Sequence, residues 1–290
     1  MINFHKFNFL DCKKLKTFLD EKNLFLYEYN PYWIFTNASF YKPEICFGNE
    51  YVFIRYNLPG TGKVYYPPIK NHGGNLEMTL LEMAEDANEL EIPFYLGPIP
   101  EGDRRLYESL SYSVLKNDNL STYIFNMSEL SNLALNKNYK SDIKTFNKMH
   151  KDVFLKKVKK EDFTQIIEFI STIRDKQVEL DFYHKINELK ECMDHLYELD
   201  LIGVLLLDEK QTYGFAVGSL MDNCFYYHLM FYDSDVVGAL PMLISALAKY
   251  AQAFSRFAAM PAHKGKKELI DLYESLKPLR IENYNGNFTV

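Results

Sequence analysis

The pattern of apolar and polar positions predicts a regular series of elements in the second half of the chain. Apolar residues that recur every three or four positions predict helices, and short aromatic or β-branched runs between turn residues predict strands. In chain order we expect a strand at 152–158, helices at 160–174 and 186–199, strands at 201–207, 214–220 and 224–231, a helix at 240–254, a strand at 256–259, a helix at 266–276 and a strand at 279–283.

A repeated pentapeptide relates the less regular first half to the second. Leu-Tyr-Glu-Ser-Leu occurs at 106–110 and again at 272–276, each time after a basic stretch. A repeat at this separation predicts two copies of one fold, an N-terminal domain at 1–130 and a C-terminal domain at 131–290, with a basic connecting helix at about 135–151. The strands expected in the first half are 2–9, 51–56, 63–66, 94–96 and 121–125. The expected helices are one capped by Asp11, one opened by Gly-Gly-Asn at 73–75 and one at 104–110.

Composition narrows the class of protein. Apolar residues make up 47% of the 290 residues, which is enough for a sizeable core. The net charge of −6 argues against a protein that coats nucleic acid over its whole surface. Cys12, Cys46, Cys192 and Cys224 are scattered and form no Cys-x-x-Cys pair, so the sequence predicts neither a disulfide framework nor a metal site.

Polar residues near the N-terminus and the short apolar runs predict a cytoplasmic protein. Asn3, Lys6 and Asp11 interrupt any apolar core of a signal peptide. The longest apolar stretches, 201–207 and 238–248, are too short to span a bilayer. The sequence does not determine the oligomeric state. One possibility is a structural dimer module that exposes the aromatic segment at 30–41.

Five lysines of the connecting helix step by three or four residues, a spacing that places them on one helix face. Ile143 and Phe146 fall toward the opposite face. Such a face can bind the phosphates of a cofactor, a lipid headgroup or tRNA, or it can simply be solvated. We call this set the lysine stripe: Lys137, Lys140, Lys144, Lys148 and Lys151.

The element order of the second half, β-α-α-β-β-β-α-β-α-β, resembles that of GNAT acyltransferases. Further residues that carry the resemblance are Leu135, Ile143 and Phe146, the run Phe-Tyr-Tyr-His at 225–228, and Gly-Ala-Leu-Pro-Met-Leu at 238–243. The chain resembles the phosphatidylglycerol lysyltransferase C-terminal-domain-like family and, more distantly, the Fem aminoacyltransferases. The resemblance implies an α/β (α+β) fold of two tandem GNAT-like acyl-CoA N-acyltransferase lobes, each a mixed, mostly antiparallel sheet flanked by helices.

The resemblance implies a place for an activated carrier in the second lobe. In GNAT enzymes the loop before the third helix holds the cofactor pyrophosphate on backbone N–H groups at a helix N-terminus. Here that loop has kept only its glycine, and the alternative is an ordinary helix start. A basic loop before the last helix offers further phosphate contacts. The cofactor-binding candidates are Val237, Gly238, Ala239, Leu240, Lys264 and Lys266.

Candidate catalytic residues come from the central strand and from the pentapeptide. In GNAT enzymes a tyrosine of the last helix protonates the departing thiolate, which implies this role for Tyr273 and, with less weight, for Tyr107. His228 is the candidate base for an attacking amine. Strict alternation would place Tyr226, a third candidate, on the face of His228, with Phe225, Tyr227 and Leu229 on the other. Each side chain could instead serve only packing.

Two functions remain open at this point. The first is an acyl or aminoacyl transferase that uses acetyl-CoA, another acyl-CoA or aminoacyl-tRNA and a small-molecule, lipid or peptide acceptor with an amine or hydroxyl. Lysine contacts to phosphates would suit tRNA, which is then a possible partner. The alternative is a degenerate, non-catalytic GNAT-like module that binds a phosphate-bearing ligand or partner.

Overall fold

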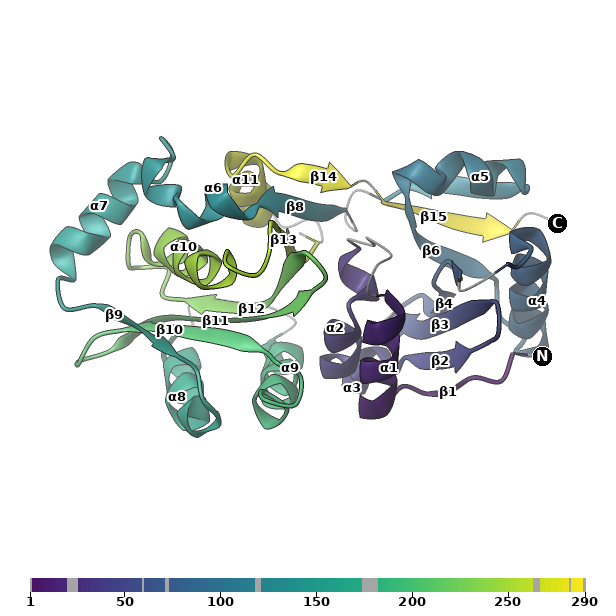
Figure 1. The fold of residues 1–290 in the computed structure, drawn as a ribbon, viewed down its shortest axis with the longest axis horizontal. Helices are drawn as coiled ribbons and strands as arrows, with labels where there is room; N and C mark the ends of the chain where they lie inside the picture. The colour runs from purple at the N-terminus through teal and green to yellow at the C-terminus, as the bar shows by residue number, and fades with distance from the viewer. Residues whose placement is uncertain are drawn as a thin grey trace. The chain divides into compact units, whose positions relative to one another are not determined.

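The computed structural model describes residues 2–19, 26–58, 60–70, 73–117, 121–173, 182–262, 267–281 and 283–288. Contacts divide the chain into two compact units (Figure 1). The first lobe comprises Met1–Thr122, Ala262–Lys267 and Arg280–Val290, and the second lobe comprises Tyr123–Pro261 and Glu268–Leu279. The division expected at residue 130 stays a prediction, and the structure adds segments near the C-terminus that return to the first lobe.

The first lobe is a sheet with helices on both faces. Helices α1 to α3 cover one face, and α4 and α5 pack on the other around Tyr65, Leu96 and Tyr284. Its elements are β1 (His5–Lys6), α1 (Phe9–Leu19), η1 (Tyr27–Tyr29), α2 (Pro31–Thr36), α3 (Ala38–Tyr41), β2 (Glu44–Phe47), β3 (Tyr51–Leu58), β4 (Gly62–Tyr65), β5 (Ile69–Lys70), α4 (Leu76–Glu89), β6 (Tyr95–Pro100), η2 (Glu101–Asp103), α5 (Arg104–Ser109), β7 (Tyr112–Lys116) and β15 (Asn283–Phe288).

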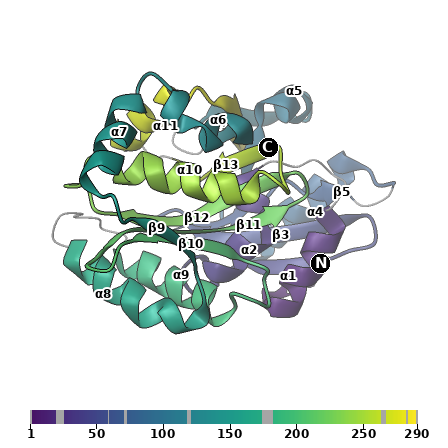
Figure 2. The same ribbon diagram turned by 60° about the vertical axis from the view of Figure 1, so that its left-hand side comes forward.

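The second lobe repeats this layered arrangement. Helices α6, α7, α10 and α11 pack on one face of its sheet, and α8 and α9 cover the other (Figure 2). Its elements are β8 (Thr122–Asn126), α6 (Met127–Ser131), η4 (Leu133–Leu135), α7 (Lys140–Met149), β9 (Phe154–Lys157), η5 (Lys160–Asp162), α8 (Phe163–Ile173), α9 (Phe182–Asp194), β10 (Ile202–Leu207), β11 (Thr212–Met221), β12 (Cys224–Tyr232), α10 (Ala239–Ala251), β13 (Phe257–Met260), α11 (Lys267–Ser275) and β14 (Leu279–Ile281).

The two sheets have matching strand orders. The first runs β1-β2-β3-β4-β6-β15-β7, with β5 beside β3, and the second runs β9-β10-β11-β12-β13-β8-β14. Each contains one parallel pair, β4–β6 and β12–β13, among the strand pairs whose register is described, and the others are antiparallel. This matches the mixed, mostly antiparallel sheets expected from the sequence.

The two halves of the chain exchange one strand each. In the first sheet β15, from the C-terminal half, lies between β6 and β7. In the second sheet β8, which follows β7 in the chain, lies between β13 and β14. Each exchanged strand is an interior strand, so each sheet is completed by a segment of the other half. The sequence pattern predicted a strand near β8 but not β15, and it predicted neither exchange.

Two expectations for the first half are corrected. Asn8, not Asp11, caps α1, because the Leu10 N–H donates to the Asn8 side chain while the Asp11 carboxylate accepts from the Asn8 N–H. The aromatic segment at 30–41 forms α2 and α3, and most of it is buried within the first lobe rather than exposed. Asn30 begins α2 by accepting from the N–H groups two and three residues on.

Candidate functional site

Strand β12 places His228 inside the second lobe. The imidazole is 6% exposed, and its Nε2 atom lies 2.8 Å from the Oγ of Ser219 on β11. Burial lowers the pKa of His228 from 6.5 to about 3, because removal from water disfavours the charged imidazolium. Tyr226 is fully buried on the same strand. The catalytic roles of both residues stay predictions; the histidine is a neutral, hydrogen-bonded side chain.

A β-bulge at His228 changes the faces of β12. The register with β11 shifts between the partners of Tyr227 and Leu229, which leaves His228 as the extra residue. Beyond the bulge Met230 packs on the same apolar cluster as Tyr227. The expectation that Leu229 shares a face with Tyr227 is therefore wrong, because one extra residue shifts the alternation by one position.

Tyr273 on α11 is committed to packing and to one backbone contact. It is 1% exposed, its ring lies 4.8 Å from that of Tyr123, and its hydroxyl donates to the Pro261 carbonyl at 2.9 Å. Burial raises the pKa of Tyr273 above its usual value. The role of Tyr273 as general acid stays a prediction, and in this structure its proton is held by a carbonyl oxygen.

Gly238 lies directly against α7 and has a backbone conformation that favours glycine. Its φ of +87° is left-handed, and a Cβ there would lie 2.5 Å from the Asp142 carbonyl oxygen and 2.9 Å from the Phe146 Cβ. Close helix packing therefore accounts for the glycine without a cofactor. In the same loop Val237 is exposed, Ala239 is buried and Leu240 is half-buried. The role of all four residues in cofactor binding stays a prediction.

The lysine stripe is exposed along α7 and the turns beside it. Lys140, Lys144 and Lys148 lie on the helix, whose opposite side buries Ile143 and Phe146. Lys137 and Lys151 lie in the flanking turns, so the connecting helix is shorter than the expected 135–151. No ion pair joins a stripe lysine to a carboxylate in the part of the chain that the structure describes. Lys264 and Lys266, the remaining phosphate-binding candidates, lie outside the described residues.

A pocket of about 320 Å³ opens in the first lobe, where the two parallel strands β4 and β6 end. This volume suits a small ligand. Parallel neighbours leave their carboxyl ends at the same edge of a sheet, and the segments that follow them form the walls. The first-lobe pocket is lined by Leu26, Tyr29, Pro67, Pro68, Ile69, Lys70, Pro100, Asp103 and Tyr107.

Three of the residues that line the first-lobe pocket carry polar groups with no partner among the described residues. Asp103 makes no cap hydrogen bond to α5, and within the described ranges neither Asp103 nor Lys70 is in an ion pair. Tyr107 is the tyrosine of the first pentapeptide, and no described residue forms a hydrogen bond with its hydroxyl. The Asp103 side chain is exposed at the pocket, yet nearby apolar groups partly desolvate it and raise its pKa.

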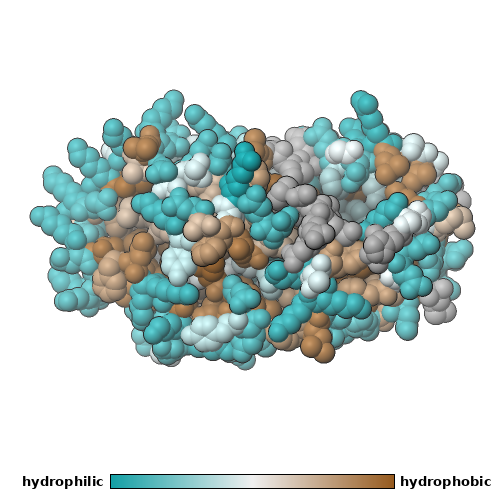
Figure 3. Space-filling view, viewed as in Figure 1, coloured by the Kyte–Doolittle hydropathy of each residue, from teal (hydrophilic) through white to brown (hydrophobic). Residues whose placement is uncertain are grey.

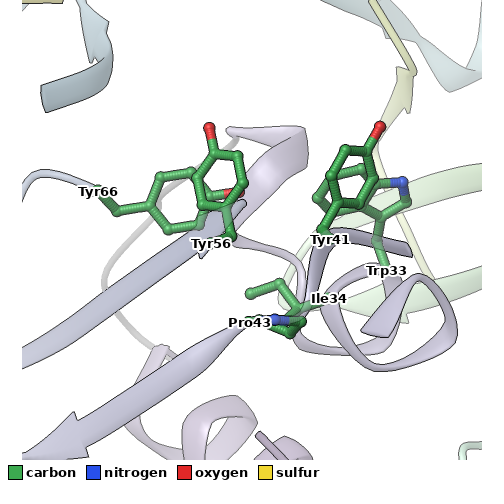
Figure 4. Close-up of a pocket in the computed structure, with 6 residues that line it drawn as sticks. All are labelled: Trp33, Ile34, Tyr41, Pro43, Tyr56 and Tyr66. Atoms are coloured by element: carbon green, nitrogen blue, oxygen red, sulfur yellow. The ribbon is translucent and has the colours of Figure 1, made fainter. Parts of the chain in front are cut away.

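Stacked aromatic rings support the wall of the first-lobe pocket. The Tyr29 ring stacks on that of Tyr66 at 4.9 Å, and the Tyr29 hydroxyl donates to the Pro67 carbonyl at 3.1 Å. Behind this wall a cavity of about 10 Å³ lies between Tyr56 and Tyr66 on one side and Tyr41 and Trp33 on the other (Figure 4). It has room for about one water molecule, so it is part of the packing rather than a substrate site.

Sequence reasoning found Tyr107 but missed Asp103, Lys70 and Tyr29. One signal was present: Asp103 lies four residues before Tyr107, one helical turn away, at the start of the repeated helix. Lys70 and Tyr29 come from other elements, and no spacing in the sequence links them to the pentapeptide. In the described part of the chain, no group of three or more His, Cys, Asp or Glu side chains is placed to hold a metal ion.

No family model matches the sequence, and no curated protein matches it significantly. Solved structures do match. A conserved protein of unknown function from Bacteroides thetaiotaomicron is 17% identical, with a TM-score of 0.87 over 100% of both chains. The C-terminal domain (DUF2156) of a protein assigned as lysylphosphatidylglycerol synthetase, from Agrobacterium fabrum, is 8% identical, with a TM-score of 0.67 over 97% of this chain and 92% of its own.

FemX is 10% identical to this chain, with a TM-score of 0.63 over 100% of this chain and 98% of its own. At such identities the matches establish the fold alone. Within the described residues no helix has both the length and the apolar character needed to cross a membrane. The chain consists of two tandem GNAT-like lobes, a fold that it shares with the lysylphosphatidylglycerol synthetase domain, with FemX and with a known tandem GNAT protein.

Proposed function

We propose that the protein transfers an acyl or aminoacyl group from an activated carrier to an acceptor bound in the first-lobe pocket. The observation that carries this proposal is a pocket at the ends of two parallel strands. It is lined by three polar groups, from Asp103, Lys70 and Tyr107, that have no partner among the described residues. The acceptor offers an amine or a hydroxyl. The cytoplasmic location expected from the sequence remains part of the proposal.

The pocket offers a general base for the attacking group. The Asp103 carboxylate accepts the proton of the acceptor amine or hydroxyl as the new bond to the acyl carbon forms and the bond to the carrier breaks. Partial desolvation raises the pKa of Asp103, which makes its carboxylate a stronger base. Lys70 can hold a carboxylate or phosphate of the acceptor, and the Tyr107 hydroxyl can donate to the departing oxygen or sulfur.

The donor is acetyl-CoA, another acyl-CoA or aminoacyl-tRNA. The similar Agrobacterium fabrum protein is assigned as lysylphosphatidylglycerol synthetase, and this supports an aminoacyl donor and a lipid acceptor as candidates. If the reaction instead takes place in the second lobe, the proposed contacts for carrier phosphates are Val237, Gly238, Ala239, Leu240, Lys264 and Lys266. In that case His228, Tyr226 and Tyr273 are the proposed catalytic residues.

A second candidate function, a non-catalytic lobe pair that binds a phosphate-bearing ligand, also has support. His228 is buried and neutral, Tyr273 donates to a carbonyl, and Gly238 is accounted for by helix packing. Under this alternative the first-lobe pocket binds its ligand without turnover.

Calorimetry with acetyl-CoA and with free CoA, followed by transfer assays with acyl-CoA and aminoacyl-tRNA donors, tests the proposal. We expect Asp103→Asn to lower kcat/KM roughly 100-fold or more, as loss of a general base does. Tyr107→Phe should also lower it, whereas the matched Tyr273→Phe, which removes the same hydroxyl from the other pentapeptide, should leave it nearly unchanged.

The pH dependence of kcat/KM gives an independent readout. Because Asp103 acts as a base, activity should rise with pH, with a midpoint above the ordinary aspartate value of about 4. Turnover that survives Asp103→Asn, or that is lost with Tyr273→Phe and not with Tyr107→Phe, would move the site to the second lobe. Ligand binding with no turnover for any donor would favour the non-catalytic alternative.

A further inference from the structure

We propose that the second lobe binds the surface of an anionic lipid bilayer through residues 137–160 and the apolar side chains beside them. Within this basic segment nine lysines stand against two aspartates, a formal charge of +7, although the whole chain carries −6. The positive charge is therefore concentrated on one stretch, which runs from the turn before α7 through β9 to the start of η5. Concentrated lysines are attracted to anionic lipid headgroups.

The lysine stripe is available to an outside partner. Elsewhere in the basic segment Lys156 pairs with Asp162, and Lys160 pairs with Glu198. By contrast, the five stripe lysines are exposed, and no carboxylate of the described residues pairs with them. Like charges at helical spacing repel one another, so a partner that supplies negative charge relieves an existing repulsion.

Exposed apolar side chains accompany the lysines. Leu135, just before the stripe, is 80% exposed, and Met149, at the end of α7, is 71% exposed. Phe154 and Leu155 are exposed on β9, the last strand of its sheet, whose outer edge pairs with no described strand. The space-filling view shows hydrophobic side chains among hydrophilic ones at the end of the second lobe where α7 and β9 lie (Figure 3).

This combination favours a bilayer over RNA. Lysines alone would suit either partner, because both carry phosphates. An RNA backbone, however, offers nothing to an exposed leucine or methionine, whereas the boundary between headgroups and acyl chains buries such side chains while the ammonium groups bind headgroups. The basic segment also has no arginine, the residue that stacks on bases and forks onto phosphates.

Flotation of the purified protein with vesicles tests the proposal. Vesicles of phosphatidylcholine alone and of an equal mixture of phosphatidylcholine and phosphatidylglycerol are compared, with bulk tRNA as a competitor. We expect flotation only with the anionic vesicles. Because each lysine near an anionic surface strengthens binding roughly fivefold, Lys144→Ala/Lys148→Ala should weaken binding roughly 25-fold.

Matched variants separate this surface from general effects. Lys190→Ala/Lys210→Ala removes the same charge from exposed positions outside the basic segment and should leave flotation unchanged. Met149→Gln should weaken flotation several-fold, whereas Met78→Gln, at a methionine that is exposed on α4 of the first lobe, should not. All four positions are exposed, so the variants should fold.

The proposal would be overturned by no flotation with anionic vesicles, by flotation that is unchanged in the Lys144→Ala/Lys148→Ala variant, or by binding of tRNA with no binding of vesicles. Loss of flotation in the Lys190→Ala/Lys210→Ala control would show attraction by overall charge and would also overturn it. The outcome is independent of the proposed transfer reaction, because no residue of the first-lobe pocket belongs to this surface.

Discussion

At the scale of single residues, identical local sequences have different chemical surroundings. The two copies of Leu-Tyr-Glu-Ser-Leu both form helix and both bury their tyrosine. Tyr273 donates to the Pro261 carbonyl, whereas Tyr107 lines the first-lobe pocket and its hydroxyl has no described partner. The sequence could predict the tyrosines and their helices, but segments distant in the chain decide which hydroxyl is available.

His228 should make the stability of the protein sensitive to acid. Its folded pKa of about 3 lies below its ordinary value of 6.5, so between these pH values the unfolded chain binds a proton that the folded chain does not. The free energy of unfolding should therefore fall as pH drops through this window, at roughly 1.4 kcal/mol per pH unit from this group. Denaturant unfolding of the wild type and of His228→Gln at several pH values measures the difference.

Ser219→Ala is the control for this prediction. It removes the hydrogen-bond partner but keeps a buried imidazole, so the acid sensitivity should remain even if the overall stability changes. Equal slopes for the wild type and His228→Gln between pH 6.5 and pH 4 would mean that the imidazole becomes protonated without unfolding.

At the scale of elements, local pattern predicted most of the second half, because most strands and helices there have a clear apolar face. The expected helices and strands from 152 to 281 all occur, with shifted ends. The pattern failed where pairing partners decide the outcome. Strand β15 contains Asn-Gly-Asn and little apolar character, and it is held by β6 and β7 on both sides. Such support comes from tertiary structure and leaves no periodic signal.

The contact of α7 with the start of α10 should depend on the absence of a side chain at Gly238. Gly238→Ala places a methyl group against the Asp142 carbonyl and also forces alanine into the left-handed region. The second effect alone costs about 1–2 kcal/mol, and we expect a larger loss in the free energy of unfolding. Gly60→Ala is the matched control, because Gly60 has a φ of +80° but nothing within 4 Å of its added Cβ.

Thermal or denaturant unfolding of both glycine variants separates the cost of backbone strain from the cost of a steric clash with α7. Equal losses for the two would mean that α7 moves aside at little cost. Calorimetry with acetyl-CoA on Gly238→Ala adds a test of the predicted cofactor role: a variant that is destabilised but binds as the wild type does would assign Gly238 to packing alone.

At the scale of the whole molecule, the exchanged strands make the two halves interdependent. A cut after residue 130 leaves the N-terminal fragment without β15 and the C-terminal fragment without β8. Each loss removes an interior strand and exposes two unpaired edges, which favours aggregation or unfolding. We expect neither fragment to unfold cooperatively alone, and the two refolded together to recover the circular-dichroism spectrum and cooperative unfolding of the intact chain. An N-terminal fragment that folds cooperatively by itself would contradict this.

The strand exchange also sets an order of events during synthesis. Strand β7 ends at Lys116, but its neighbour β15 begins only at Asn283, after nearly the whole second lobe has been translated. The ribosome must therefore release most of the polypeptide while β6 and β7 still lack the strand that joins them. During that interval the nascent first lobe exposes strand edges whose backbone groups are not hydrogen-bonded. We therefore expect chaperones to bind the first lobe more than the rest of the nascent chain.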